Sequence, residues 1–309
     1  MESKMRTKIC MDILVLTFTL LSGISSRSFG QYPAALASDP DPVNWSEPAA
    51  PTKIAGPVYF VGTKGLAVWL ITTTEGHILL NTGTQGSGPL IEASIRKLGF
   101  KPEDIKILLI CHAHFDHVGG LAYMKKLSGA QIAVIDREVD LLQSGGKTDF
   151  HYGHNPSFAF EPVKTDRVFH DGDTITLGNI AMTANLTPGH TKGTTTWTMK
   201  VTDTGKLYTV VFPDGTSVNP GYRVARNPSY PGIGDDYRRT FQTLESLKPD
   251  IWLAPHNEVS DFAGKRARAA NEGVTAWVDP DGYKTWVAAR KAQFEAAVSR
   301  EMAESPKPQ

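Results

Sequence analysis

The pattern of hydrophobic and polar positions divides the chain into short strands, turns and a few amphipathic helices. In the first half, runs rich in β-branched and aromatic residues predict strands within 57–62 and 67–83. Residues 89–100, "PLIEASIRKLGF", space their leucines and isoleucines for one face of a helix. The run "IKILLIC" at 105–111 is apolar on both faces, so it predicts a strand inside a sheet that is covered on both sides.

The same alternation continues along the chain and gives a second half built like the first. A helix is predicted at 119–129 and a strand at 131–136. The second half predicts strands at 174–179, 180–188, 194–201, 206–214 and 250–256, with helices at 235–248 and 283–302. The two halves share a β-then-α order without a fixed repeat period. They predict an α/β protein in which two sheets pack against each other, with helices on the outside.

The first 30 residues have a different pattern. Lys4, Arg6 and Lys8 precede the run "ICMDILVLTFTLLSGI", which Asp12 interrupts and which falls short of the roughly 20 apolar residues of a spanning helix. We therefore expect a cleaved signal peptide at 1–30, with a membrane anchor as the alternative. The product is expected in a bacterial periplasm, with no membrane attachment after cleavage.

Composition adds limits on the partners and on the remaining domains. Residues 31–57, rich in Pro, Ala, Asp and Ser, predict an extended N-terminal arm held by Trp45, or else a disordered linker, before a domain at 58–309. The formal net charge of +0 gives no reason to expect a nucleic-acid partner, and we expect a monomer. Outside the signal segment Cys111 is the only cysteine, so no internal disulfide can form. Cys111 is interpreted as a small buried residue or as a redox-sensitive thiol.

The candidate chemistry lies in the sequence "HAHFDH", at 112–117, directly after the buried run. Histidines at i and i+2 of an extended segment point the same way, and the aspartate and last histidine lie where the chain turns into the next helix. Neutral imidazole and carboxylate are the ligands that zinc takes outside thiolate sites, and one catalytic zinc needs about three of them. Four ligands in six residues therefore indicate two metals, completed by His190 in "TPGHTKG" and His256 in "LAPHNE".

This motif order resembles the metallo-β-lactamase superfamily, from about Val58 to His256. The segments "NWSEPAAPTKIAG", "HTKGTTTWTMKV", "SVNPGYR" and "DDYRRTFQTLESL" are similar to the subclass B3 metallo-β-lactamases in particular. The absence of cysteine from "FPDGTSVNP", and the direct succession of Asp116 and His117, also favour subclass B3. The resemblance implies a four-layer αββα sandwich and an exported zinc enzyme that opens the β-lactam ring of penicillins, cephalosporins and carbapenems, conferring antibiotic resistance.

The resemblance also implies the roles of the site residues. The first of two zinc ions would be held by His112, His114 and His190, and the second by Asp116, His117 and His256. A zinc-bound hydroxide would attack the lactam carbonyl, with Asp116 orienting it. No G-x-S-x-G elbow occurs after the signal segment, so a serine hydrolase is not favoured.

The substrate would meet residues of "DGTSVNPGYR". Thr216, Ser217 and Asn219 are candidates for binding the substrate carboxylate, and Tyr222 is a candidate donor to the developing oxyanion, the alternative being ordinary turn residues. The family often shows Ser-x-Ser here, and Gly215 stands at the first serine position, so carboxylate binding is expected to differ.

A long segment before this region predicts a second contributor to the cleft. Residues 144–162, aromatic and glycine-rich, are typical of a flap over an active site, with Phe150, Tyr152 and Phe158 as candidate walls or as plain surface packing.

An alternative function depends on Asp214. In glyoxalase II and in lactone-cleaving relatives, an aspartate at this strand end bridges the metals, so a dinuclear lactonase or thioesterase is the competing hypothesis. The chain lacks room after His256 for the added helical domain of glyoxalase II. A non-catalytic metal-binding protein is the third possibility, and it would leave no open coordination position.

Overall fold

The computed structural model describes residues 43–304, so the predicted signal peptide at 1–30 lies outside the described residues. Seven strands form one sheet in the order of the chain: β1 (Thr52–Ala55), β2 (Val58–Phe60), β3 (Trp69–Thr73), β4 (Gly76–Leu80), β5 (Ile105–Leu109), β6 (Gln131–Ile135) and β7 (Arg167–Phe169). The first four are antiparallel, whereas β4 to β7 run parallel. Parallel neighbours end at one edge, so β4, β5 and β6 deliver the residues that follow them to the same side of the sheet.

A second sheet has five strands in the order β12 (Ile251–Trp252), β11 (Lys206–Phe212), β10 (Thr195–Asp203), β9 (Ile180–Leu186) and β8 (Thr174–Leu177). Strand β12 runs parallel to β11, and the other neighbours are antiparallel. The segments after β11 and β12 therefore leave this sheet at the same edge. They carry Asp214 and His256 respectively.

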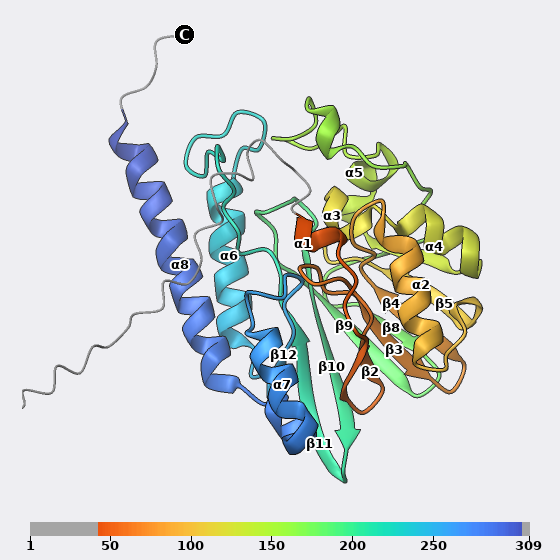
Figure 1. The fold of residues 1–309 in the computed structure, drawn as a ribbon. Helices are drawn as coiled ribbons and strands as arrows, with labels where there is room; N and C mark the ends of the chain where they lie inside the picture. The colour runs from red at the N-terminus through yellow and green to blue at the C-terminus, as the bar shows by residue number, and fades with distance from the viewer. Residues whose placement is uncertain (1–42, 305–309) are drawn as a thin grey trace, which may run out of the picture. The chain divides into compact units, whose positions relative to one another are not determined.

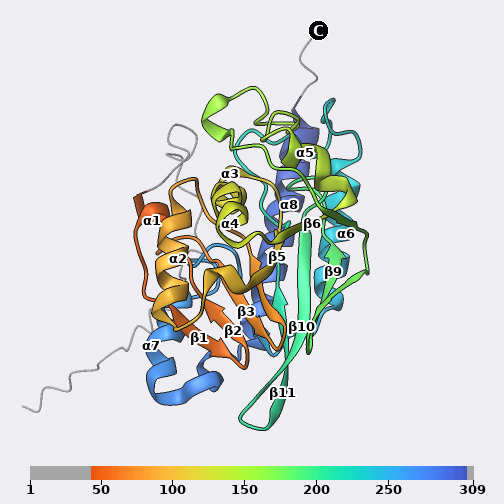
Figure 2. The same cartoon turned by 90° about the vertical axis from the view of Figure 1, so that its right-hand side faces the viewer.

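The two sheets pack face to face with helices on both outer sides (Figures 1 and 2). Alternate residues of β5 show why: Ile107 and Leu109 belong to the core between the sheets, whereas Leu108 belongs to the core beneath the outer helices. Helices α2 (Ser87–Lys97) and α4 (Leu121–Ser128) cover the first sheet, and α6 (Ile233–Ser246) and α8 (Pro280–Ala303) cover the second. The expected four-layer αββα arrangement is confirmed.

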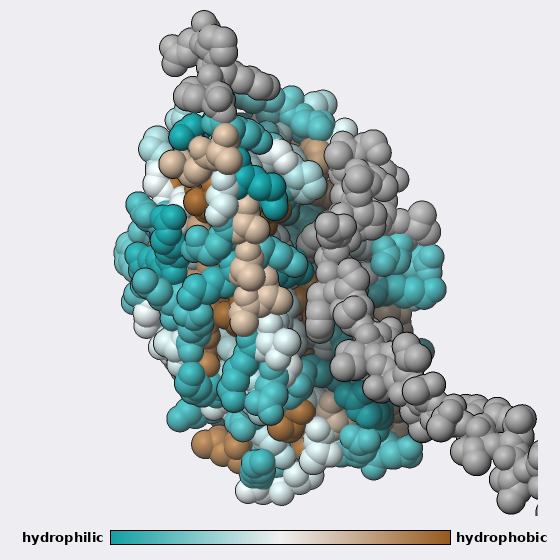
Figure 3. Space-filling view, turned by 90° about the vertical axis from the view of Figure 1, so that its left-hand side faces the viewer, coloured by the Kyte–Doolittle hydropathy of each residue, from teal (hydrophilic) through white to brown (hydrophobic). Residues whose placement is uncertain are grey.

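Four further α-helices occur among the described residues. They are α1 (Val43–Ser46), α3 (Phe115–Val118), α5 (Val139–Gln143) and α7 (Phe262–Glu272), with 3₁₀ turns at Pro102–Asp104, Asp136–Glu138, Pro156–Phe158 and Gly273–Trp277. The surface on the side of α8 is predominantly hydrophilic, as expected for the solvent face of an outer helix (Figure 3). Within residues 43–304 we find no helix that is both long enough and apolar enough to cross a bilayer.

The sheet begins inside the segment that was expected to be an arm. Strand β1 pairs antiparallel with β2, because Ile54 and Ala55 turn inward to the core between the sheets. Trp45 is buried as predicted, and its ring lies against Phe115 and His256. Residues 52–55 of the predicted arm are thus part of the first sheet.

Candidate metal centre

The loop after β5 carries the predicted motif to the edge of the first sheet. His112 and His114 lie in an extended stretch, and Asp116 and His117 follow in the first turn of α3. Asn81 has a backbone φ of +65°. Its side-chain oxygen accepts a hydrogen bond from the backbone amide of Cys111, which fixes the end of β5. His190 comes from the turn between β9 and β10, and His256 from the segment after β12.

All six predicted ligand residues come together here, and all are buried or nearly so. One nitrogen of each of His112, His114 and His190 lies within 4.8 Å of the others, and the same holds for ligand atoms of His112, Asp116 and His117. His117 Nε2 and His256 Nε2 lie 3.3 Å and 3.5 Å from Asp116 Oδ2. Two neighbouring ligand groups therefore share one buried volume.

The chemistry of these donors fits metal ions. His112 Nε2 is buried and has no hydrogen-bond partner among the described residues, which is costly unless a ligand completes it. Burial, helped by the neighbouring histidines, holds the pKa of His112 well below its usual value and lowers the pKa of His190 to about 3. Both rings are therefore neutral at pH 7, which is the form that binds metal.

The Asp116 carboxylate is the anionic partner of this cluster. Burial opposes its ionisation, but the histidines His117 and His256 overcome this and hold the pKa of Asp116 below its usual value. The group is thus an ionised oxygen donor beside His117 and His256. Carboxylate and imidazole together are the donor set of catalytic zinc sites.

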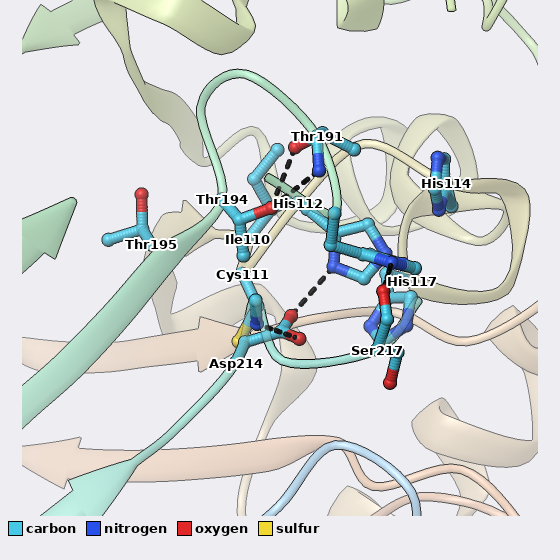
Figure 4. A network of polar contacts seen from close by, with 12 residues as sticks. Ile110, Cys111, His112, His114, His117, Thr191, Thr194, Thr195, Asp214 and Ser217 are labelled. Atoms are coloured by element: carbon cyan, nitrogen blue, oxygen red, sulfur yellow. Dashed lines mark hydrogen bonds and ion pairs between the residues drawn. The ribbon is translucent and has the colours of Figure 1, made fainter. Parts of the chain in front are cut away.

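Each histidine of the first group is oriented by an acceptor on its far side. His112 Nδ1 lies 2.7 Å from Asp214 Oδ2 (Figure 4), and His114 Nε2 lies 3.1 Å from Asp149 Oδ2. His190 Nδ1 lies 2.9 Å from the carbonyl oxygen of Ser217. These contacts leave the opposite ring nitrogens facing the common volume, as is usual for histidines that bind metal.

Asp214 does not join either ligand group. Its second oxygen accepts the Gly215 amide at 2.7 Å, and burial raises the pKa of the carboxyl to about 6. Each Asp214 oxygen therefore has a hydrogen-bond partner within the chain, and the residue supports the orientation of the His112 ring. The bridging role that the competing hypothesis required is not the arrangement seen here.

Two buried acids that no sequence motif marks also support the cluster. Glu138, in the turn after β6, accepts from the Ala113 and Gly193 amides and from Thr191 Oγ1, joining the motif loop to the His190 loop. Burial raises the pKa of Glu138 to about 7 despite these donors. The only signal in the sequence was its place after a parallel strand of the same sheet. Asp149 lies in the flap, where no motif marks it.

A cavity of about 280 Å³ opens over the cluster. Its walls include the predicted substrate residues Thr216, Ser217 and Asn219 and, from the flap, Tyr152 and Phe158, whose rings stack at 4.2 Å. Arg290 of α8 is the only lysine or arginine among the described lining residues.

Two predicted aromatic residues are placed elsewhere. Phe150 is not part of the cavity wall, because it packs against Tyr222 and Tyr230. The Tyr222 hydroxyl donates to the carbonyl oxygen of His190 at 3.1 Å, away from the described lining of the cavity. Its role as an oxyanion donor stays a prediction.

Comparisons with known proteins agree with this geometry. Residues 63–203 match the family model of the metallo-beta-lactamase superfamily. A probable metallo-hydrolase of Burkholderia pseudomallei is 32% identical over 70% of this chain and 75% of its own. The native FEZ-1 metallo-beta-lactamase of Legionella gormanii superposes with a TM-score of 0.82 at 42% identity, covering 84% of this chain and 98% of that one. BJP-1, a subclass B3 metallo-beta-lactamase of Bradyrhizobium japonicum, gives 0.79 at 37% identity, with 84% and 98% covered.

Proposed function

Because the chain belongs to the metallo-β-lactamase superfamily, we propose that it is a subclass B3 enzyme that hydrolyses the amide bond of β-lactams. The observation that carries this proposal is the pair of candidate ligand groups that meet at His112, beneath a cavity walled by Ser217 and by the flap. The similarity to B3 enzymes over nearly their whole length supports it. We further propose that the chain acts in the periplasm after loss of residues 1–30.

The proposed metals are two zinc ions. The first would be held by His112, His114 and His190 and the second by Asp116, His117 and His256, each set supplying three ligands and leaving room for water or substrate. Bound zinc supplies Lewis-acid chemistry, since it lowers the pKa of a water molecule and polarises a carbonyl group.

The chain's own residues supply the rest. Asp116, held ionised, accepts a hydrogen bond from the attacking water and orients it toward the lactam carbonyl. Thr216, Ser217 and Asn219 line the side of the cavity where the substrate carboxylate would bind. Tyr152 and Phe158 cover the substrate and exclude bulk water, which strengthens the electrostatic contacts beneath them.

The competing function is hydrolysis of lactones or thioesters by the same ligands. It needs Asp214 at a metal, and Asp214 is instead occupied by His112 and Gly215. This contact favours the β-lactam proposal.

The test is hydrolysis of nitrocefin and of a carbapenem by residues 31–309, with and without EDTA, followed by addition of zinc. We expect turnover that EDTA abolishes and zinc restores. His190→Ala should lose activity, whereas His170→Ala, which alters an exposed histidine paired with Asp136, should keep it. Two bound zinc ions without turnover of either β-lactam would refute the proposal and make an acyl-homoserine lactone and a thioester the next substrates.

A further inference from the structure

The flap contains one carboxylate that faces two ways. Asp149 Oδ2 lies 3.1 Å from His114 Nε2, while Asp149 Oδ1 accepts the backbone amides of His151 and Tyr152 at 2.8 Å and 2.6 Å. The Asp149 side chain is only 2% exposed. The same group therefore ties the flap turn and orients a histidine of the metal centre.

The residues tied by Asp149 form the wall of the cavity. Tyr152 stacks on Phe158, its ring meets the His114 ring edge-on at 5.5 Å, and its hydroxyl accepts from Asn219 at 3.0 Å. Phe158 in turn lies 5.4 Å from the Phe115 ring, at the start of α3. A shift of the turn at 149–152 would move this wall and the acceptor for His114 together.

The position of the hydrogen on the His114 ring links metal binding at His114 to the flap turn that Asp149 holds. For His114 to bind metal through Nδ1, Nε2 must carry the hydrogen, and Asp149 Oδ2 is its acceptor. The carboxylate is held in that orientation only while its other oxygen is engaged by the flap amides.

We propose that Asp149 is a positioning residue that couples metal binding at His114 to the ordering of the flap wall at 149–158. The inference rests on the proposed metal centre. Coupling between two binding events is reciprocal. Metal binding therefore orders the flap wall, and a substrate that contacts Tyr152 and Phe158 increases the affinity for the metal. The flap is thereby a reporter of the metal centre as well as a cover for it.

A purely local role for Asp149, as a turn former, makes a different prediction from coupling. Asn at position 149 can still accept the two flap amides through its oxygen, since Asn and Asp form the same turn. Its NH₂ group would then face the His114 N–H, which loses its acceptor. Asp149→Asn therefore separates the two roles.

The matched control is Ser144→Ala. Ser144 Oγ bonds the amide and hydroxyl of Thr148 at the base of the flap and touches no histidine. The Ser144→Ala substitution removes these hydrogen bonds at the base of the flap and leaves the contacts of the metal centre unchanged.

The experiment measures zinc affinity and amide hydrogen exchange on residues 31–309. In competition with a chromophoric chelator, Asp149→Asn should weaken the first zinc about 10- to 100-fold, the usual cost of losing such a partner, while Ser144→Ala leaves it unchanged. In the unaltered chain, zinc should slow exchange at the amides of His151 and Tyr152, and this slowing should be lost in Asp149→Asn. Affinity equal to the unaltered chain would overturn the proposal.

If Asp149→Asn fails to fold, hydrogen exchange of the unaltered chain still tests the coupling. Equal exchange rates at His151 and Tyr152 with and without zinc would refute it. These readouts do not depend on turnover. A chain that hydrolyses β-lactams while its flap ignores zinc refutes the coupling alone. A chain whose flap responds to zinc but that hydrolyses no β-lactam refutes the proposed function alone.

Discussion

His112 Nδ1 lies 2.7 Å from Asp214 Oδ2, in a contact that joins the end of β5 in one sheet to the end of β11 in the other. The carboxylate thus contacts Nδ1 of His112, the ring nitrogen on the side away from the candidate metal position. Since both Asp214 oxygens meet donors of the chain, the residue supports His112 and lies outside both candidate ligand groups.

The first prediction concerns Asp214→Asn. The amide keeps one acceptor but puts a donor against either His112 or Gly215, so zinc affinity should fall about 10- to 100-fold while two zinc ions still bind at saturation. Titration with zinc, with metal content measured after gel filtration, checks both numbers. If the variant holds only one zinc at saturation, Asp214 is a direct ligand and the lactonase hypothesis regains support.

Most of the strands, and the cluster of six candidate ligand residues, could be predicted because their signals are local. Buried parallel strands are apolar on both faces, and "HAHFDH" concentrates four donors in six residues. Strand β7 has three residues, too few for periodicity, and α7 has good helix formers but no apolar stripe, so neither was predicted.

The supporting contacts could not be predicted, because they join segments distant in the chain. Glu138 reaches Thr191 and Gly193, and Asp149 reaches His114, through folding alone. Phe150 was predicted as a wall of the cavity because it is an aromatic residue of the flap. Its direction was decided by Tyr222 and Tyr230, which lie more than 70 residues along the chain and offer it an apolar pocket.

The second prediction concerns Tyr222→Phe. The Tyr222 hydroxyl donates to the His190 carbonyl, and a neutral hydrogen bond contributes about 0.5–1.5 kcal/mol. We therefore expect kcat for nitrocefin to fall less than about tenfold, in line with that energy. An oxyanion donor would cost about 10²- to 10³-fold, so a loss of that size would show that the hydroxyl turns to the substrate during the reaction.

The third prediction concerns Ser217→Ala. The Ser217 carbonyl is held by His190 and by the Tyr237 hydroxyl, so the backbone should keep its place when the side chain is shortened. Loss of a hydrogen bond to a substrate carboxylate costs about 1.5–3 kcal/mol, so KM should rise about tenfold or more with kcat largely kept. Steady-state kinetics with a carbapenem checks this. Ser246→Ala, on the exposed end of α6, is the control.

An unchanged KM in Ser217→Ala would show that the substrate carboxylate binds elsewhere in the cavity. Arg290, which lines the same cavity from α8, is then the residue to substitute next.

The fourth prediction concerns Cys111. Its thiol is 2% exposed, it accepts from Asn81 Nδ2 at 3.5 Å, and burial raises its pKa well above the usual value. The thiol is therefore protonated and shielded, so residues 31–309 should not react with a disulfide reagent while folded. One thiol should appear on addition of guanidinium chloride. Rapid labelling without denaturant would instead support a redox-sensitive site beside the metals.

The last prediction concerns Glu301, which fastens α8 to the loop after Tyr222. Its carboxylate accepts the amides of Val224, Ala225 and Arg226 at 2.6–2.8 Å and pairs with Arg223 Nε at 3.3 Å. Burial opposes ionisation, but these amides lower the pKa of Glu301 below its usual value. Glu301→Gln turns an NH₂ group toward the same donors, which should lower the free energy of unfolding at pH 7 by about 1.5–3 kcal/mol.

The pH dependence follows from the direction of that pKa. A carboxyl whose pKa is lower in the folded chain stabilises the fold above its unfolded pKa of about 4.3, and this stability is lost as the pH falls through the folded value. The gap between the unaltered chain and Glu301→Gln should therefore be full at pH 7 and narrow below about pH 4. Urea unfolding of the metal-free chains at both pH values measures it, with Glu295→Gln, an exposed position of the same helix, as control. A gap that stays constant with pH would mean that the Glu301 carboxylate contributes through packing and not through its charge.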